Sequence, residues 1–423
     1  MDFGSDAFAV GSLAEVTRGL SGSEILRIGA EIRKRKAAGE TVCNLTVGDF
    51  DPAQFPIPDE LREGVREALA AGATNYPPSD GTPELRAAVA ELYARELGLD
   101  YPVESVLIAS GARPLLYGTY RTLVDPGDLV VYPLPSWNNN HYVHLLGARA
   151  AELPVTAATN FFPRAEDFEP HLSEARLIVL NSPLNPTGTM IDAGALRALC
   201  VRIVEENRRR EQRGEKGLWL CYDQVYWQLC FGSNRHASPP AVLPEVAPYT
   251  VLIDAASKSY AATGLRVGWA LMPPVVRQRM ADIIGHVGAW APKAEQVAMT
   301  RLLRDPGALA RYATSFKANL KARLDRLAEG FAAMQAEGYP VEIIDPQGAI
   351  YLSLRVVKPG RSNEAIREHL LERAGFAVVP FQAFGLADET GWFRLSVGAV
   401  SMKEIQEALP RVEATLRAAV SGG

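Results

Sequence analysis

Short apolar runs alternate with amphipathic segments along the first three quarters of the chain. Uninterrupted apolar stretches of this length are typical of buried strands, and they occur at 106–109, 129–132, 177–180, 218–221, 250–253 and 267–271. Helical or long connecting segments separate most of them, as in crossover units of an open sheet. We therefore predict an α/β fold with a large domain built on a mostly parallel, doubly wound sheet.

Two helices have clear signals at the level of single residues. Isoleucines recur on one helical stripe over residues 24–36, which predicts an amphipathic helix there. Farther along, Thr82 and Pro83 form a good N-cap and first-turn pair, and Gly98 is placed to end the helix. Both helices should pack against the core.

The last quarter of the chain has a different pattern, in which helices and strands are mixed. We predict helices at 308–333, 364–374 and 403–419, and strands at 341–344, 349–356 and 392–397. This pattern predicts a small α+β domain, joined by the N-terminal segment. The expected division is an N-terminal segment at 1–49, a large domain at 50–300 and a small domain at 301–423.

Composition and charge exclude several classes of protein. The 423 residues are 48% hydrophobic and 22% charged with a formal net charge of -5, which is ordinary for a globular protein and gives no basic patch for nucleic acid. No apolar run reaches membrane-spanning length. The four cysteines lack CxxC spacing, and His141 and His144 have no third ligand nearby, so we expect reduced thiols, no metal and a cytoplasmic location.

Polar residues directly follow several of the predicted strands. In open parallel sheets, ligands bind beyond the carboxyl ends of the strands, so these residues should meet at one edge of the sheet. They are Ser110, Gly111, Ala112, Asn185, Asp223, Ser257 and Lys258.

A lysine, a carboxylate and a glycine turn that opens a helix together suit pyridoxal 5'-phosphate (PLP). The lysine amine forms an imine with the cofactor, and the carboxylate keeps the pyridine nitrogen protonated so that the ring accepts electrons. Backbone amides at the helix start hold the phosphate. Taken singly, Lys258 could be a surface residue and Asp223 a turn residue, but their order and shared location favour the cofactor.

These residues also carry a family resemblance. The segment from Ser257 to Gly268 resembles the lysine signature of class I/II aminotransferases of PLP fold type I, and Asn185-Pro186-Thr187-Gly188 resembles their NPTG turn. The similarity extends over roughly residues 25–419. It implies an enzyme of the aspartate aminotransferase type that moves an amino group between an amino acid and a 2-oxo acid.

The resemblance implies a role for each matched position around the cofactor ring. Lys258 would carry PLP as a Schiff base and then move the proton at the substrate α carbon. Asp223 would pair with the ring nitrogen, whereas Tyr226 and Asn185 would bind the phenolic oxygen. Trp137 would stack on the ring, unless it is an ordinary core tryptophan.

For the phosphate and the substrate, the resemblance points to other parts of the chain. The Ser110-Gly111-Ala112 turn, Ser257 and Arg266 would bind the cofactor, as would Tyr76 reaching across from the partner subunit, which implies a homodimer with shared active sites. Arg394 would bind the substrate α-carboxylate in a two-pronged contact, and Gly48, Trp137 and Asn185 would line the substrate site.

Substrate identity is the least determined part of the interpretation. Ala255 stands where many relatives have a phosphate-binding Ser or Thr, and Asn140 and 380–382 also depart from the usual pattern. Arg113 follows the phosphate turn and would favour acidic side chains, with 2-oxoglutarate and glutamate as one pair, or else it forms a surface ion pair. A PLP-dependent lyase and a non-catalytic PLP-binding regulator remain as alternative functions.

Overall fold

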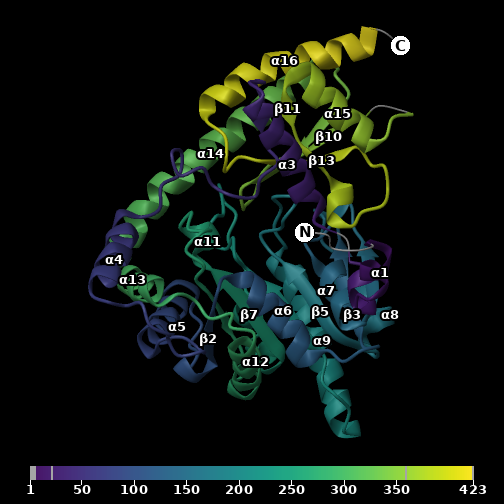
Figure 1. Cartoon of the computed structure of the whole chain (residues 1–423). Coiled ribbons are helices and arrows are strands. Elements are labelled where there is room, and N and C mark those ends of the chain that lie inside the picture. Colours follow the sequence, from purple (N-terminus) through teal and green to yellow (C-terminus); the bar gives the residue numbers. More distant parts are fainter. Residues whose placement is uncertain (1–5, 21, 358–359, 422–423) are drawn as a thin grey trace.

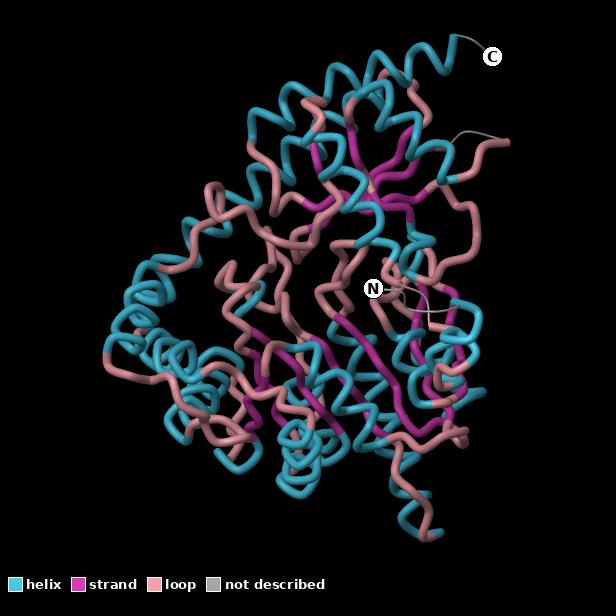
Figure 2. Tube along the Cα trace, in the orientation of Figure 1, coloured by secondary structure: helices cyan, strands magenta, loops and turns pink. Residues whose placement is uncertain are grey.

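The computed structural model describes residues 6–20, 22–357 and 360–421. Figure 1 shows a large domain in the lower part of the view and a small domain above it, with α14 (Pro306–Ala336) running between them. The strands form a broad sheet through the large domain and separate short sheets in the small one (Figure 2). Two hydrophobic cores result, one around each group of strands.

Within the described residues, the large domain contains a seven-stranded sheet in the order β2-β8-β7-β6-β5-β3-β4. Strand β8 runs antiparallel to its two neighbours, and the other neighbouring pairs from β7 to β4 are parallel. The predicted mostly parallel α/β fold is confirmed. The strands are β2 (Val106–Ala109), β3 (Leu129–Leu134), β4 (Arg149–Pro154), β5 (Ala175–Asn181), β6 (Trp219–Asp223), β7 (Thr250–Ala255) and β8 (Gly268–Leu271).

Strand β4 is the one member of this sheet that the hydrophobic pattern missed. It lies at the sheet edge, paired only with β3 among the described strands, and most of its side chains are exposed or half-buried. Only Leu153 is buried. An edge strand that faces solvent does not need an apolar run, so this segment had no detectable signal.

Helices connect the strands and cover the sheet. They are α4 (Asp59–Ala70), α5 (Pro83–Leu97), α6 (Ala112–Leu123), α7 (Asn139–Leu146), α8 (Ala165–Leu172), α9 (Ala193–Arg213), α10 (Pro239–Val242), α11 (Ala256–Ser259), α12 (Pro274–His286) and α13 (Lys293–Leu303). Helix α6 crosses β5 to β8 and packs against α12. Short α11 follows β7 directly, which places its residues at the carboxyl edge of the sheet.

The start of α5 corrects one detail of the predicted capping. The helix begins at Pro83, and Gly98 ends it in the left-handed region at φ +66° as predicted. However, the Thr82 side chain makes no cap hydrogen bond. The Thr82 backbone N–H donates instead to the Gln296 side chain at 2.8 Å, so this helix start is fixed by a contact with α13.

The small domain combines segments from both ends of the chain. Its described strands form an antiparallel sheet in the order β12-β13-β10-β9 and a parallel pair of β1 with β11. The elements are β1 (Cys43–Asn44), β9 (Val341–Ile344), β10 (Tyr351–Val356), β11 (Phe376–Ala377), β12 (Val379–Pro380), β13 (Trp392–Ser396), α15 (Asn363–Ala374) and α16 (Met402–Ser421). The pairing of β1 with β11 joins the N-terminal segment to this domain. The boundaries at 49/50 and 300/301 stay predictions.

Strand β10 begins two residues later than predicted. Ala349 has a φ of +61°, outside the extended region, so the apolar run from 349 starts in a turn. Ahead of the large domain lie α1 (Asp6–Gly11), α2 (Glu15–Arg18) and α3 (Glu24–Ala37), of which α3 buries Ile28 and Ile32 as its pattern predicted.

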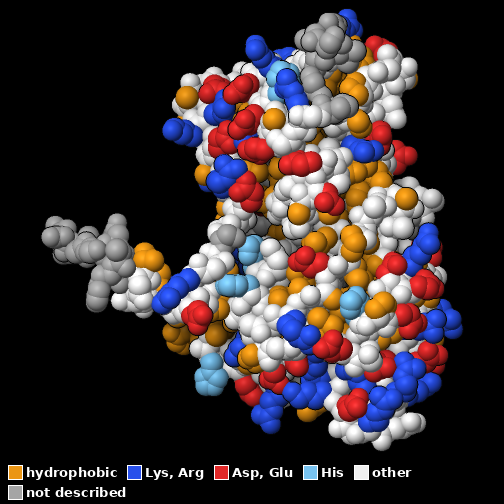
Figure 3. Space-filling view, turned by 90° about the vertical axis from the view of Figure 1, so that its right-hand side faces the viewer, with side chains coloured by type: hydrophobic (Ala, Val, Ile, Leu, Met, Phe, Trp, Pro, Cys, Tyr) orange, Lys and Arg blue, Asp and Glu red, His pale blue; other side chains and the backbone are white. Residues whose placement is uncertain are grey.

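The surface carries charges of both signs. Lysine and arginine side chains are interspersed with aspartate and glutamate over the face shown in Figure 3. Across the described residues, no helix combines the length and the apolar character that crossing a membrane requires.

Candidate active site

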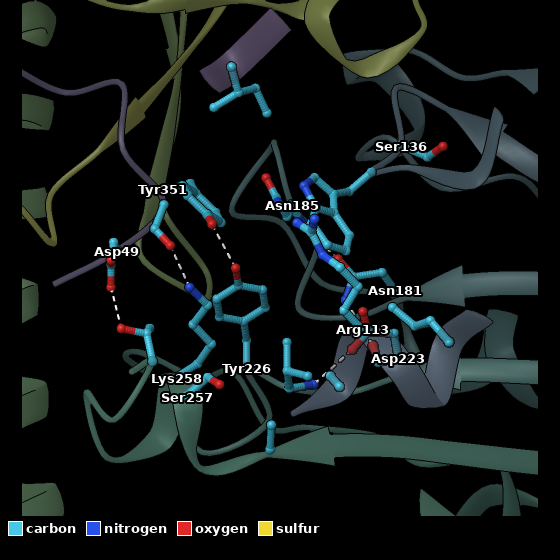
Figure 4. Close-up of a pocket in the computed structure, with 18 of the residues that line it drawn as sticks. Asp49, Arg113, Ser136, Asn181, Asn185, Asp223, Tyr226, Ser257, Lys258 and Tyr351 are labelled. Atoms are coloured by element: carbon cyan, nitrogen blue, oxygen red, sulfur yellow. Dashed lines mark hydrogen bonds between the residues drawn. The ribbon is translucent and has the colours of Figure 1, made fainter. Parts of the chain in front are cut away.

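A cavity of about 620 Å³ lies between the carboxyl edge of the large sheet and the small domain. Its walls come from the ends of β5, β6 and β7, from the start of α6, from α3, and from β10 and β13. Most of the residues predicted to form the site line it, namely Gly48, Ala112, Arg113, Trp137, Asn185, Asp223, Tyr226, Ser257, Lys258, Arg266 and Arg394. Figure 4 shows Lys258 and Tyr226 approaching from one side and Asn185 and Asp223 from the other.

Lys258 occupies α11, and its amine points into this cavity. Its Nζ donates a hydrogen bond to the Gly48 carbonyl oxygen. Burial lowers the pKa of Lys258 to about 8, with Asp49 acting in the opposite direction. A larger fraction of the amine is therefore neutral near physiological pH than in an exposed lysine, and only the neutral amine is a nucleophile.

Asp223 ends β6 and is buried at the bottom of the cavity. It accepts a hydrogen bond from the Val225 backbone N–H at 3.2 Å. Burial raises the pKa of Asp223 to about 7, and the amine of Lys258 lowers it only as a lesser contribution. Because a desolvated carboxylate favours a cationic neighbour, this position suits a ligand with a protonated ring nitrogen.

Tyr226 meets a residue that sequence analysis did not identify. Its hydroxyl lies 2.6 Å from the hydroxyl of Tyr351, which belongs to β10 of the small domain. The two rings meet edge to face with centroids 5.6 Å apart. Tyr351 had no sequence signal beyond its place in an apolar strand, because its partners come from distant segments.

Arg394 projects from β13 into the same space and is only 1% exposed. Its Nη1 donates to Asn185 Oδ1 at 3.1 Å and its Nη2 to the Thr46 carbonyl oxygen at 2.6 Å. The guanidinium lies 4.9 Å from the ring centroids of Tyr351 and Phe384. Among the described residues, no carboxylate forms an ion pair with Arg394, and its Nε is buried without a hydrogen-bond partner. A buried guanidinium of this kind suits a ligand carboxylate.

A second cationic corner lies at the start of α6. Arg266 donates from Nη1 to the Thr263 carbonyl at 2.7 Å and from Nη2 to the Ser110 carbonyl at 2.9 Å. Gly111 precedes α6 at φ +85°, and a Cβ at this position would collide with the Arg266 guanidinium. A Cβ on Gly268 would lie 2.8 Å from the Ala112 backbone nitrogen. The two glycines therefore let a helix N-terminus and an arginine meet, which is an anion-binding arrangement.

Ser110 and Gly111 do not themselves line the cavity. Ser110 contributes to the site through its carbonyl oxygen, which accepts the hydrogen bond from Arg266.

Tyr76 lies outside the cavity of its own chain. Its side chain is 82% exposed and packs edge to face against Trp290, with ring centroids 5.5 Å apart. This exposure leaves Tyr76 accessible to a second subunit.

Arg113 and Trp137 lie against each other at the cavity wall. The Arg113 guanidinium stacks over the Trp137 ring at 4.7 Å from the centroid. No described acidic side chain pairs with Arg113, which weakens the interpretation as a surface ion pair. Asn140 and residues 380–382, where the sequence departs from the family pattern, are not among the cavity-lining residues.

Asn181 is a further site residue that was missed. Its Oδ1 accepts from the Asn185 backbone N–H and its Nδ2 donates to the Asp223 carbonyl, both at 2.8 Å. It thereby links two predicted site residues. Asn181 directly follows the apolar run at 177–180, so the rule that identified Asp223 was sufficient to find it.

The donor and acceptor set fits PLP. The cavity combines an amine of lowered pKa, a buried carboxylate, and an arginine beside the start of α6. Arg394 adds a buried cation for a substrate carboxylate. Each part of the cofactor thus has a group of complementary charge.

Comparison with known proteins agrees with this geometry. The family model "Aminotransferase class I and II" matches residues 40–412. An aspartate aminotransferase of Rhizobium meliloti is 30% identical over 407 residues, covering 93% of this chain and 94% of the relative. An aspartate/prephenate aminotransferase of Thermus thermophilus is 30% identical over 404 residues, covering 94% and 97%.

Solved structures show the same likeness. An aspartate aminotransferase from Thermus thermophilus with maleate has a TM-score of 0.86 at 28% identity, covering 96% of this chain and 99% of that chain. An aminotransferase from Mycobacterium tuberculosis also has a TM-score of 0.86, at 25% identity and the same coverage. The chain therefore belongs to the class I and II aminotransferase family and is a PLP-dependent transaminase.

Proposed function

We propose that this transaminase exchanges an amino group between an amino acid and a 2-oxo acid, with Lys258 as the residue that carries PLP and moves the proton. Glutamate and 2-oxoglutarate form one of its substrate pairs. The main support is the position of the Lys258 amine, which faces the same cavity as Asp223 and Arg394. Lowering of its pKa to about 8 by burial suits both nucleophilic attack and proton transfer.

Arg394 would fix the substrate by its α-carboxylate. The planar guanidinium can make two parallel hydrogen bonds to a carboxylate, and Asn185 and the Thr46 carbonyl hold it in place. This contact would orient the substrate α carbon toward the Lys258 amine, which can then remove the proton from that carbon.

When bound, PLP supplies a ring that withdraws electrons from the bonds at the substrate α carbon. Asp223 would support this by remaining ionised opposite the ring nitrogen. Tyr226 would donate a hydrogen bond from its hydroxyl to the phenolic oxygen, and the same hydroxyl can accept one from Tyr351. Arg266 and the amides that start α6 would hold the phosphate.

Preference for acidic substrates rests on Arg113. Its guanidinium lines the cavity and has no acidic partner among the described residues. Relatives named aspartate aminotransferase, and a similar structure that holds the dicarboxylate maleate, agree with a substrate that carries two carboxylates. Arg113 would bind the carboxylate distal to the one bound by Arg394.

A homodimer with shared active sites is part of the proposal. Tyr76 is exposed and lies outside its own cavity, as expected of a residue that completes the site of a partner. Dilution of the protein should lower the specific activity once subunits separate. A cytoplasmic location remains a prediction from the sequence.

The decisive experiment separates amino transfer from elimination. PLP-loaded protein is mixed with glutamate and no acceptor, and the visible absorption and the released products are followed. Transfer predicts one equivalent of 2-oxoglutarate per site, loss of the visible absorption, and full recovery when a 2-oxo acid is added. A parallel reaction with cysteine, whose thiol can leave from the β carbon, tests the lyase alternative: release of sulfide, ammonia and pyruvate in repeated turnovers would support it.

A further inference from the structure

A buried polar network lies directly behind the cofactor end of the cavity. Its centre is Asp254 on β7, which is 0% exposed. The Oδ2 atom of Asp254 accepts hydrogen bonds from Trp227 Nε1 at 2.7 Å and from the Tyr93 hydroxyl at 3.2 Å. Its Oδ1 accepts from the Ala255 backbone N–H at 2.7 Å. One carboxylate therefore joins α5, β7 and the segment after β6.

The network continues from Tyr93 to a second buried residue. Gln224 Nε2 donates to the Tyr93 hydroxyl at 3.1 Å, and Gln224 Oε1 accepts from the Ser238 hydroxyl at 2.7 Å. The Gln224 backbone N–H donates to the Ile253 carbonyl at 2.9 Å. These bonds fasten the segment after β6 to β7.

Three residues of the network adjoin residues of the cavity wall in the chain. Asp223, Tyr226 and Ala255 line the cavity, whereas their chain neighbours Gln224, Trp227 and Asp254 belong to the network and do not line it. Lys258 follows Asp254 within the next turn of chain. The network thus holds, from behind, the two segments that carry the ionisable groups of the site.

The buried carboxylate of Asp254 is not expected to raise the free energy of unfolding. Its partners are neutral donors, and none of the ion pairs of the described residues includes it. Burial raises the pKa of Asp254 to about 7, with the charge of Asp223 as a lesser contribution. A buried carboxylate without a cation usually destabilises a fold, and the hydrogen bonds of Asp254 join segments that carry site residues.

We propose that Asp254 is a positioning residue that keeps Asp223, Tyr226 and Lys258 in their working geometry through its bonds to Trp227 and the backbone of Ala255. The proposal rests on the proposed function, because it concerns how the groups that would hold PLP are fixed. It assigns no contact between Asp254 and the cofactor or substrate.

An amide at this position tests the proposal with almost no change of volume. Asp254 accepts hydrogen bonds at both oxygens, but an Asn offers one oxygen and one NH₂ group. In Asp254→Asn the NH₂ must face either the Trp227 indole N–H or the Ala255 N–H, so one of these two donors loses its acceptor. Trp227→Phe removes the donor of the shorter of the two side-chain hydrogen bonds that Asp254 accepts.

The control is Glu206→Gln on α9. Glu206 is also a buried carboxylate and pairs with Arg210 at 2.9 Å, far along the chain from the site. For all three variants we would measure the PLP dissociation constant of the cofactor-free protein, the pH midpoint of the visible absorption, kcat and KM, and the thermal unfolding midpoint. The loss of a hydrogen bond to a buried charged group changes a dissociation constant by about 10- to 100-fold.

We expect Asp254→Asn and Trp227→Phe each to weaken PLP binding by about tenfold or more, to shift the pH midpoint and to lower kcat with little change of KM. The double variant should lose less than the product of the two effects, because both act on one bond. Glu206→Gln should lower only the unfolding temperature.

A purely structural Asp254 would lower the unfolding temperature and leave PLP affinity and the pH midpoint as in the unmodified protein, which overturns the proposal. If Asp254→Asn does not fold, Trp227→Phe with unchanged PLP affinity and pH midpoint overturns it equally. Failure of the proposed function has a different result, in which the unmodified protein binds PLP but transfers no amino group.

Discussion

Two groups of residues in the active-site cavity differ in how far they are buried. In the buried group, Asp223 and Tyr226 are buried and Lys258 is hydrogen-bonded to the Gly48 carbonyl. In the exposed group, Arg113 is exposed at the start of α6, and Leu26 of α3 lines the cavity while 66% exposed. The first group is held by the protein, and the second is open to solvent.

This difference separates the residues that carry out the reaction from those that select the substrate. The reaction depends on groups whose pKa values are changed by burial, and such groups need a fixed surrounding. Substrate choice depends on contacts that form only when an amino acid enters, from exposed residues such as Arg113. Substitutions should therefore have large effects in the buried group and graded, substrate-dependent effects in the exposed group.

The largest effect should come from Lys258→Ala. Without the amine, proton transfer at the α carbon loses its acid–base group, and turnover should fall by about a thousandfold or more. The visible absorption of the PLP-loaded protein should also change. Steady-state assays and spectra check this, with Lys321→Ala on the exposed face of α14 as a control that keeps full activity.

Next in size is Asp223→Ala. An unpaired ring nitrogen loses its proton, so α-proton removal in a single turnover should slow by about a hundredfold, whereas PLP still binds weakly. Stopped-flow measurement with α-deuterated glutamate follows this step directly. Proton removal at the rate of the unmodified protein would show that Asp223 is not the partner of the ring nitrogen.

A smaller effect concerns the pH dependence of the buried group. The pKa of Lys258 is lowered to about 8 by burial, so the neutral amine fraction rises with pH through this value and is nearly constant above about pH 9. The rate at which cofactor-free protein captures PLP should rise by about tenfold from pH 7 to 9 and then level off. A rate that keeps rising toward pH 10.5 would mean an ordinary, exposed lysine.

The smallest expected effect is in the exposed group, in Arg113→Met. Because Arg113 is exposed, its ion pair with a distal carboxylate should be weaker than a buried pair, and KM for glutamate should rise by about five- to tenfold. KM for alanine or phenylalanine should change little. Equal changes for acidic and neutral donors would remove Arg113 from the specificity site.

The same contrast shows how far sequence reasoning reaches. The central strands were predictable because strands buried on two faces must be continuously apolar, whereas exposed β4 had no such constraint. Lys258, Asp223 and Asn185 were found because they follow apolar strands within local motifs. Tyr351 and Asp254 were not, because their roles depend on contacts with segments distant in sequence.

The central claim is that Lys258 carries the cofactor, and mass spectrometry tests it most directly. PLP-loaded protein is reduced with sodium borohydride and digested, and the peptide that carries the pyridoxyl group is sequenced. The label should be found on Lys258 at one equivalent per chain and should be absent from that peptide in Lys258→Ala. Labelling of a different lysine, or no labelling of a protein that binds PLP, would contradict the account.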